Sequence, residues 1–93
     1  MDWHVYIIRC RDGTFYTTIT NNLDQRIREH NRGKGCRYTK YRWPVKLLYQ
    51  ETFPDKVAAM KREAKIKGWD RKKKMILIDG RLGLKMILES PRR

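Results

Sequence analysis

The stretch WHVYIIRCRDGTFYTTIT, residues 3–20, decides the fold. It holds two runs of mainly β-branched, aromatic and aliphatic residues, 3–10 and 14–20, which are typical of strands. The residues between them, Arg-Asp-Gly at 11–13, are typical of a tight turn. The stretch therefore predicts a β-hairpin, and its first run is apolar enough to be the central strand of a sheet.

The length of the turn sets the register of this hairpin and the face on which each tyrosine lies. A two-residue loop would place Tyr6 and Tyr16 on opposite faces of the sheet. A three-residue loop, with Gly13 left-handed as a bulge, pairs Tyr6 with Thr18 and Ile8 with Tyr16. We adopt the second register because it separates polar from apolar side chains better. One face then carries His4, Tyr6, Tyr16, Thr18 and Thr20, and the other carries Trp3, Val5, Ile7, Phe15 and Ile19.

The rest of the chain predicts three helices and one more strand. Asn21 or Asn22 caps a helix that runs to about Asn31, with Leu23 and Ile27 buried. The later elements are a strand over residues 45–51, a helix that begins near Pro54 and ends near Lys67, and a shorter helix capped by Asp70 that carries Met75, Ile76 and Ile78.

The expected order is β-β-α-β-α-α, which predicts an α+β fold in which helices flank a three-stranded antiparallel sheet. We expect residues 1–80 to form one domain and residues 81–93 to be a C-terminal extension. The extension is apolar and then basic, so a frayed tail, a last helix and an oligomer contact all remain open.

Charge is the strongest compositional signal. The chain has 23 Lys and Arg against 10 Asp and Glu, a formal net charge of +13. Such a field attracts polyanions, so nucleic acid is the expected partner, although a basic surface that only confers solubility stays open.

Other function classes are disfavoured by the sequence. No segment approaches the 18 apolar residues of a membrane span, and the N-terminus lacks a secretory pattern. Cys10 and Cys36 are too few for a disulfide framework, which favours the reducing cytoplasm. Their spacing with the two histidines matches no zinc motif.

Four segments together resemble the GIY-YIG nuclease superfamily, and more narrowly its small single-domain bacterial branch, often called YhbQ- or YazA-like. The likeness covers about residues 3–78 and depends on the order and spacing of its motifs. These are VYII at 5–8, YTTIT at 16–20, LDQRIREHNRGKG at 23–35 and MKREAKIK at 60–67. The fold that the resemblance implies, a three-stranded antiparallel sheet flanked by helices, agrees with the one expected above.

The resemblance implies metal-assisted cleavage of a phosphodiester, in DNA rather than RNA. Tyr6 and Tyr16 match the tyrosines of the two half-motifs, and Arg26 matches the catalytic arginine of the family. His30 falls at a position that is histidine or tyrosine in relatives. Glu63 matches the glutamate that holds the single divalent ion.

These residue types suit that chemistry. Mg²⁺ or Mn²⁺ needs only one or two carboxylates because it keeps much of its water, so Glu63 can suffice. Arg26 can neutralise a phosphate in bidentate fashion. We expect Tyr6 to be the base and Tyr16 to position the reactants. Taken singly, each of these residues also suits an ordinary structural role. The tyrosines suit a hydrophobic core, and Arg26 with His30 suits a solvated helix face. Glu63 with Lys67 suits a surface ion pair.

Thr18 departs from the family motif, which ordinarily has glycine at this position. Its methyl and hydroxyl groups are expected to crowd the reacting water or phosphate. His4 also replaces a frequent glycine, and a terminal asparagine of many relatives has no match. Thr18 therefore favours an alternative, a non-catalytic DNA- or RNA-binding module with the nuclease fold. The net charge taken alone favours a third possible function, that of an RNA- or ribosome-associated basic protein.

The loop after the first helix interleaves cations with aromatic rings, a composition suited to phosphates and exposed bases. Trp43, beside Pro44, and one of the tyrosines are expected to anchor the loop to the core. The residues expected to bind nucleic acid are Arg37, Tyr38, Lys40, Tyr41 and Arg42 from this loop, together with Lys67.

Overall fold

The computed structural model of the chain describes the backbone of residues 2–89 and the side chains of residues 2–80. Its three strands form one antiparallel sheet in the order β2-β1-β3, so the apolar first strand is central, as predicted. The predicted α+β class and element order are confirmed. The elements are β1 (Trp3–Arg9), β2 (Phe15–Thr20), α1 (Leu23–Asn31), β3 (Lys46–Phe53), α2 (Lys56–Lys67) and α3 (Arg71–Glu89).

The hairpin between β1 and β2 has the predicted three-residue turn and register. Gly13 has a φ of +87°, a left-handed conformation that favours glycine. Tyr6 pairs with Thr18 and Ile8 with Tyr16. Both tyrosines therefore lie on one face of the sheet.

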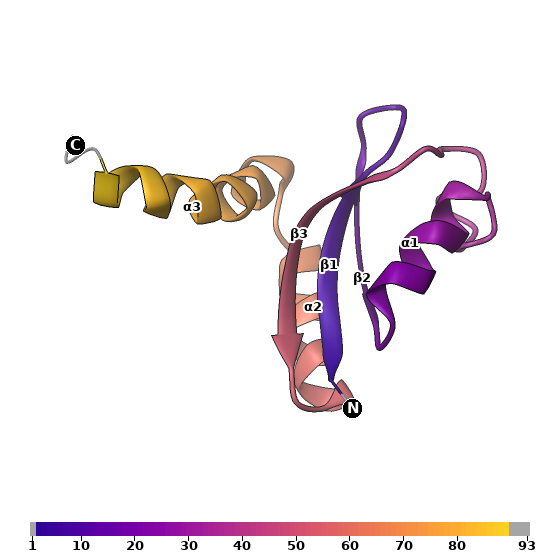
Figure 1. Cartoon of the computed structure of the whole chain (residues 1–93), viewed down its shortest axis with the longest axis horizontal. Coiled ribbons are helices and arrows are strands. Elements are labelled where there is room, and N and C mark those ends of the chain that lie inside the picture. The colour runs from indigo at the N-terminus through magenta and orange to yellow at the C-terminus, as the bar shows by residue number, and fades with distance from the viewer. Residues whose placement is uncertain (1, 90–93) are drawn as a thin grey trace.

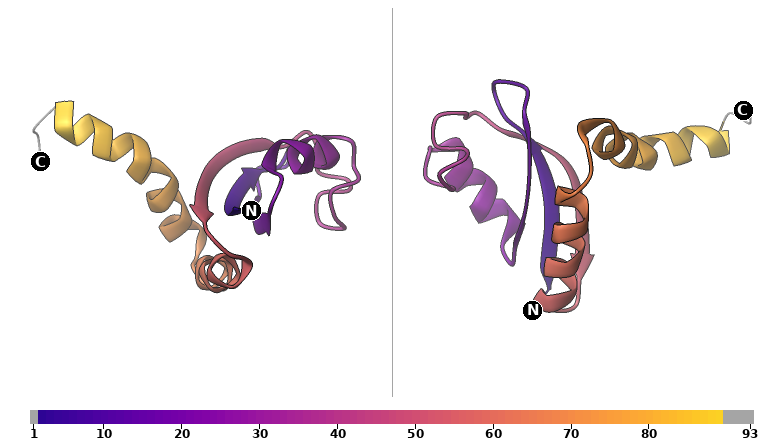
Figure 2. Two further views of the ribbon diagram at one scale, coloured as in Figure 1. Left: turned by 60° about the horizontal axis from the view of Figure 1, so that its bottom comes forward. Right: turned by 180° about the vertical axis from the view of Figure 1, so that it is seen from behind.

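The sheet is covered on both faces by helices from different parts of the chain (Figures 1 and 2). On one face, Val5 and Ile7 pack with Ala59 and Ile66 of α2. On the other, Tyr6 and Ile8 form a second buried cluster, against which Leu23 and Ile27 of α1 pack. Tyr6 and Tyr16 thus lie on the face of the sheet that α1 covers.

Side-chain caps and one ion pair fix where the two covering helices sit. Asn22 accepts a hydrogen bond from the backbone N of Gln25 at 3.2 Å, which decides between the two expected caps of α1. Asp55 caps α2. Arg62 of α2 donates two hydrogen bonds, of 2.8 and 2.9 Å, to the carboxylate of Glu51 in β3. This two-bond ion pair links α2 to the sheet and fixes the rotation of the helix about its axis.

The last helix is longer than expected. Asp70 caps it as predicted, but the helix continues through Gly80 to Glu89 and extends away from the sheet (Figures 1 and 2). Glycine inside a helix costs only about 1 kcal/mol relative to alanine, and the leucines, lysine and methionine after it favour the helix. Of the expected extension, residues 90–93 lie outside the described part of the chain. The third strand also reaches Phe53, because β1 offers pairing partners that far.

Candidate active site

Tyr6 is the innermost residue of the candidate site. Its side chain has no exposed surface, and its hydroxyl oxygen lies 2.9 Å from Nε2 of His30 on α1. Burial raises the pKa of Tyr6 well above its usual value, while the nearby Arg26 opposes this shift. Tyr6 therefore stays protonated in the resting protein.

His30 is also fully buried, and the loop after α1 encloses its ring. Its Nδ1 lies 2.8 Å from Oγ1 of Thr39. The backbone passes so close that a Cβ on Gly35 would lie 2.1 Å from Nδ1, so only glycine fits there. Burial and then the charge of Arg26 lower the pKa of His30 to about 4, so the ring is neutral at neutral pH.

Tyr16 lies next to this pair and is partly exposed. Its ring centroid is 6.1 Å from that of His30, in an edge-on arrangement, and 4.9 Å from that of Tyr38, with 13° between the two planes. Burial raises the pKa of Tyr16 to about 12, assisted by the thiol of Cys36. The hydroxyl of Thr18, two residues further along β2 on the same face of the sheet, opposes this rise in pKa.

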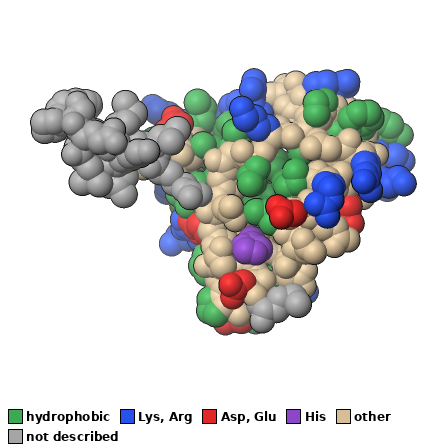
Figure 3. Space-filling view, in the orientation of Figure 1, with side chains coloured by type: hydrophobic (Ala, Val, Ile, Leu, Met, Phe, Trp, Pro, Cys, Tyr) green, Lys and Arg blue, Asp and Glu red, His purple; other side chains and the backbone are tan. Residues whose placement is uncertain are grey.

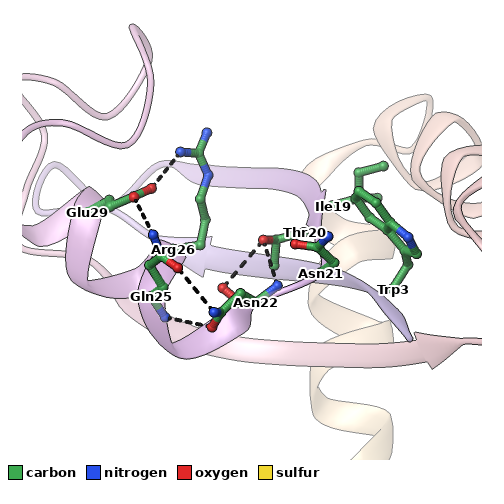
Figure 4. Close-up of a pocket in the computed structure, with 8 residues that line it drawn as sticks. All are labelled: Trp3, Ile19, Thr20, Asn21, Asn22, Gln25, Arg26 and Glu29. Carbon is green, nitrogen blue, oxygen red and sulfur yellow. Dashed lines mark hydrogen bonds and ion pairs between the residues drawn. The ribbon is translucent and has the colours of Figure 1, made fainter. Parts of the chain in front are cut away.

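Arg26 brings positive charge to both phenols from α1. Its side chain is one-third exposed and pairs with Glu29 at 2.9 Å. Figure 4 shows this pair at the rim of a hollow between the end of β2 and the start of α1, with a volume of about 330 Å³. The guanidinium therefore has an open side from which an anion can approach.

Glu63 lies on α2, the helix that packs on the opposite face of the sheet from Tyr6 and Tyr16, and among the described side chains only Lys67 links it to the site. Glu63 and Lys67 lie one turn apart on α2 and form an ion pair of 3.2 Å, and Nζ of Lys67 lies 6.0 Å from the ring centroid of Tyr16. The carboxylate keeps 19% of its side-chain surface exposed. Within the side chains described, 2–80, no group of three or more His, Cys, Asp and Glu residues is arranged to hold a metal.

This single carboxylate fits a hard divalent ion that retains most of its water, and it does not fit a metal that needs a closed protein cage. Lys67 would have to leave the carboxylate for such an ion to bind. Glu63 could hold such an ion, and its role stays a prediction.

The predicted nucleic-acid-binding residues divide into two groups. Tyr38 and Arg42 are partly buried and engaged with other groups of the protein: Arg42 lies 4.3 Å over the ring of Tyr38, and also bonds Asp12 and the carbonyl of Tyr38. Tyr38 is thus the tyrosine that anchors the loop. Trp43 contacts Gly33 but stays 45% exposed, so it is a weaker anchor than expected.

The other loop residues face water. Tyr41 is 77% exposed, and Arg37 and Lys40 are exposed beside it in the sequence. On the face in Figure 3, Lys and Arg side chains gather over α1 and the loop that follows it. These three residues are therefore the part of the loop that is free to meet a ligand.

Thr39 and Gly35 belong to the site and were not predicted. Both are buried against His30. No spacing marks a lone threonine inside a basic loop, and the glycine resembles an ordinary helix terminator. Only the approach of the loop to the ring reveals their role.

Comparison with known proteins identifies the family of the chain. Residues 2–75 match the family described as the GIY-YIG catalytic domain. The chain belongs to the GIY-YIG family. The predicted superfamily and its small bacterial branch are confirmed, since the similar curated proteins are named UPF0213 proteins, a YhbQ-like group.

Two of these relatives come from staphylococci. A UPF0213 protein of Staphylococcus saprophyticus is 49% identical over 79 residues, which cover 84% of this chain and 96% of the relative. One from Staphylococcus aureus strain N315 is 49% identical over 82 residues, 87% of this chain and all of the relative. The present chain therefore matches nearly the full length of both relatives.

Two solved structures have the same fold. The solution NMR structure of a UPF0213 protein from Bacillus halodurans is 42% identical, with a TM-score of 0.56 over 85% of this chain and 84% of the other. That of a protein from E. faecalis is 32% identical, with a TM-score of 0.59 over 88% of each chain. In the described part of this GIY-YIG domain, no helix has the length and hydropathy of a membrane span. The cytoplasmic location stays a prediction.

Proposed function

We propose that this GIY-YIG domain hydrolyses phosphodiester bonds of DNA with the help of one divalent metal ion, Mg²⁺ or Mn²⁺. Family membership supports a nuclease-type activity on nucleic acid. The observation that carries the proposal is the convergence of both phenols on one turn of α1: the rings of Tyr6 and Tyr16 lie 6.0 and 6.1 Å from that of His30, and Arg26 lies one turn before His30 on the same helix. A core or a solvated helix face does not require these groups to meet.

In this proposal Arg26 binds the phosphate. Its guanidinium exchanges the partly exposed Glu29 for two oxygens of the phosphate, a geometry for which the planar fork is suited. The positive charge then lies where negative charge develops during hydrolysis.

The two tyrosines take roles other than those expected from sequence. Tyr6 is fully buried and bonded to His30, so it holds the site together and does not meet the attacking water. Tyr16 is the partly exposed phenol and is therefore proposed to orient that water. With a pKa of about 12 it does so as a neutral hydroxyl and not as a standing phenolate.

Glu63 is proposed to hold the metal ion. When bound, the ion would polarise the phosphate and stabilise charge on the leaving oxygen. Lys67, released from Glu63, is then free to contact the DNA backbone. Arg37, Lys40 and Tyr41 extend the contact along the strand.

The test is cleavage of duplex, branched and single-stranded DNA by the purified protein with Mg²⁺ or Mn²⁺. Arg26→Ala and Glu63→Gln are expected to lower the rate at least about a hundredfold, the usual scale for loss of a charge-stabilising group. Arg28→Ala on the exposed side of α1 and Asp79→Asn on α3 are charge-matched controls that should cleave normally. Cleavage that persists equally in all four variants would come from a contaminant and would refute the proposal.

Thr18 supports a second candidate, a DNA- or RNA-binding module without cleavage. Its side chain lies across from Tyr6 and next to Tyr16 on the same face of β2, where the family motif has only a hydrogen atom. The variant Thr18→Gly separates the two candidates. A strong gain of cleavage in this variant identifies an impaired nuclease site, whereas binding without cleavage in both proteins favours the binding module.

A further inference from the structure

A chain of hydrogen-bonding groups runs through the interior of the site. It begins at the hydroxyl of Tyr6, where the charge of Arg26 opposes the rise in pKa that burial causes. From Tyr6 it passes to Nε2 of His30 at 2.9 Å, and from Nδ1 of the same ring to Oγ1 of Thr39 at 2.8 Å. It ends at the carbonyl oxygen of Cys36, 3.4 Å from Oγ1 of Thr39. Tyr6, His30 and Thr39 each have 0% exposure, so no bulk water can replace any of these bonds.

The charge of Arg26 acts on the proton of Tyr6. A guanidinium has five donors and no acceptor, whereas a phenol has one proton and two lone pairs. The positive charge therefore favours the orientation in which a lone pair of Tyr6 faces Arg26 and the proton is directed to Nε2 of His30, 2.9 Å away. In this orientation Nε2 is the acceptor and carries no proton.

The Thr39 end restricts the same ring independently. Thr39 donates its own proton to the carbonyl of Cys36, which leaves a lone pair of Oγ1 facing Nδ1 of His30. A neutral imidazole has one proton, and here it belongs on Nδ1. The requirements at the two ends agree on one tautomer.

We propose that Thr39 is a positioning residue that holds His30 in the tautomer protonated on Nδ1, and thereby keeps the lone pair of Tyr6 turned toward Arg26. Gly35 assists by leaving room for the loop against the ring. The basic loop is in this way connected to the guanidinium that is proposed to bind phosphate. The effect on cleavage rests on the proposed function, whereas the tautomer does not depend on it.

The tautomer can be measured directly by long-range ¹⁵N–¹H correlation NMR of the histidine rings at neutral pH. The wild-type protein is expected to show Nε2 of His30 as an unprotonated nitrogen and Nδ1 as a protonated one. In Thr39→Val the form protonated on Nε2 should gain population, because valine offers no acceptor to Nδ1. Thr39→Ser should restore the wild-type pattern, which a purely steric role of the threonine methyl would not predict.

The chain contains a matched control. His4 bonds Oγ1 of Thr52 through its own Nδ1 at 3.1 Å, at a position exposed to water. Thr52→Val should change the His4 signals alone. A wild-type His30 protonated on Nε2 would overturn the inference, even if Thr39→Val did not fold. So would an unchanged tautomer in a folded Thr39→Val protein.

Cleavage assays supply the second readout. Thr39→Val is expected to lower kcat about tenfold, the scale of one lost hydrogen bond, with little change in KM, and Thr39→Ser should recover it. Unchanged cleavage alongside an altered tautomer would refute the positioning role. If the wild-type protein cleaves nothing, the proposed function fails, and the NMR spectra still decide the tautomer.

Discussion

Tyr16 on β2 stacks on Tyr38 of the loop, with ring centroids 4.9 Å apart and planes within 13° of parallel. The guanidinium of Arg42 lies 4.3 Å from the same Tyr38 ring. The stack joins the partly exposed phenol of the candidate site to the basic loop, so the loop and the strand are one structural unit.

Removing the ring of Tyr38 should therefore destabilise the protein. Tyr38→Ala is expected to lower the free energy of unfolding by about 2 kcal/mol, from lost apolar contact and lost ring stacking. Tyr38→Phe keeps the ring and should change stability little. Urea unfolding followed by fluorescence measures both, and equal losses in the two variants would mean that the stack contributes nothing.

Tyr41 should behave in the opposite way. Its ring is 77% exposed, so Tyr41→Ala is expected to leave stability unchanged and to weaken binding of nucleic acid with unpaired bases by about 1 kcal/mol or more. Fluorescence anisotropy with labelled oligonucleotides measures the affinity. Affinity equal to that of wild type would remove Tyr41 from the interface.

Gly35 should tolerate no side chain. A Cβ there would lie 2.1 Å from Nδ1 of His30, so Gly35→Ala is expected to destabilise the protein by about 3 kcal/mol through overpacking. At Gly80 in α3 a Cβ meets nothing within 4 Å, and Gly80→Ala should be neutral or stabilising. Thermal unfolding compares the pair. Similar melting temperatures for the two variants would show that the loop does not press on His30.

His30 should make stability depend on pH. Burial lowers its pKa from an ordinary 6.5 to about 4, so in mildly acidic solution the unfolded chain binds a proton that the folded chain does not. Stability is therefore full above pH 6.5 and falls as the pH decreases toward 4, with a loss of about 2 kcal/mol between pH 7 and pH 5.

Urea unfolding across this pH range tests the effect. His30→Gln should flatten the slope, because it removes the group whose pKa burial lowers. A slope that survives in His30→Gln would have to come from other groups.

Lys67 should have opposite effects on two ligands. Its ammonium lies 3.2 Å from the carboxylate of Glu63, so Lys67→Met is expected to tighten binding of Mn²⁺ about twofold to fivefold, the scale of a surface ion pair. The same variant should weaken DNA binding and lower the slope of its salt dependence by about 1, the share of one phosphate contact.

Manganese relaxation enhancement of water protons measures the first effect and salt-dependent anisotropy the second. Lys65→Met, an exposed lysine of the same helix, is the control. If Lys67→Met and Lys65→Met bind Mn²⁺ equally, Glu63 is not the metal-binding group.

Much of the fold followed from local rules in the sequence. The three-residue turn, the register that pairs Tyr6 with Thr18, and the Asn22 cap depend on neighbouring residues and on which side chains avoid water. The end of α3 was not predictable in this way. Gly80 weakens a helix only slightly, so the stronger helix formers after it decide the outcome.

The contacts within the candidate site could not be predicted from the sequence alone. Spacing placed Tyr6, Tyr16, Arg26, His30 and Glu63 in family order, and the register placed both tyrosines on one face. Only the tertiary structure decided that Tyr6 is fully buried, that Tyr38 stacks on Tyr16, and that Thr39 contacts the ring of His30. The reason is physical: strand pairing repeats every two residues and is encoded locally, whereas burial and hydrogen-bond direction depend on groups that only the folded chain brings together.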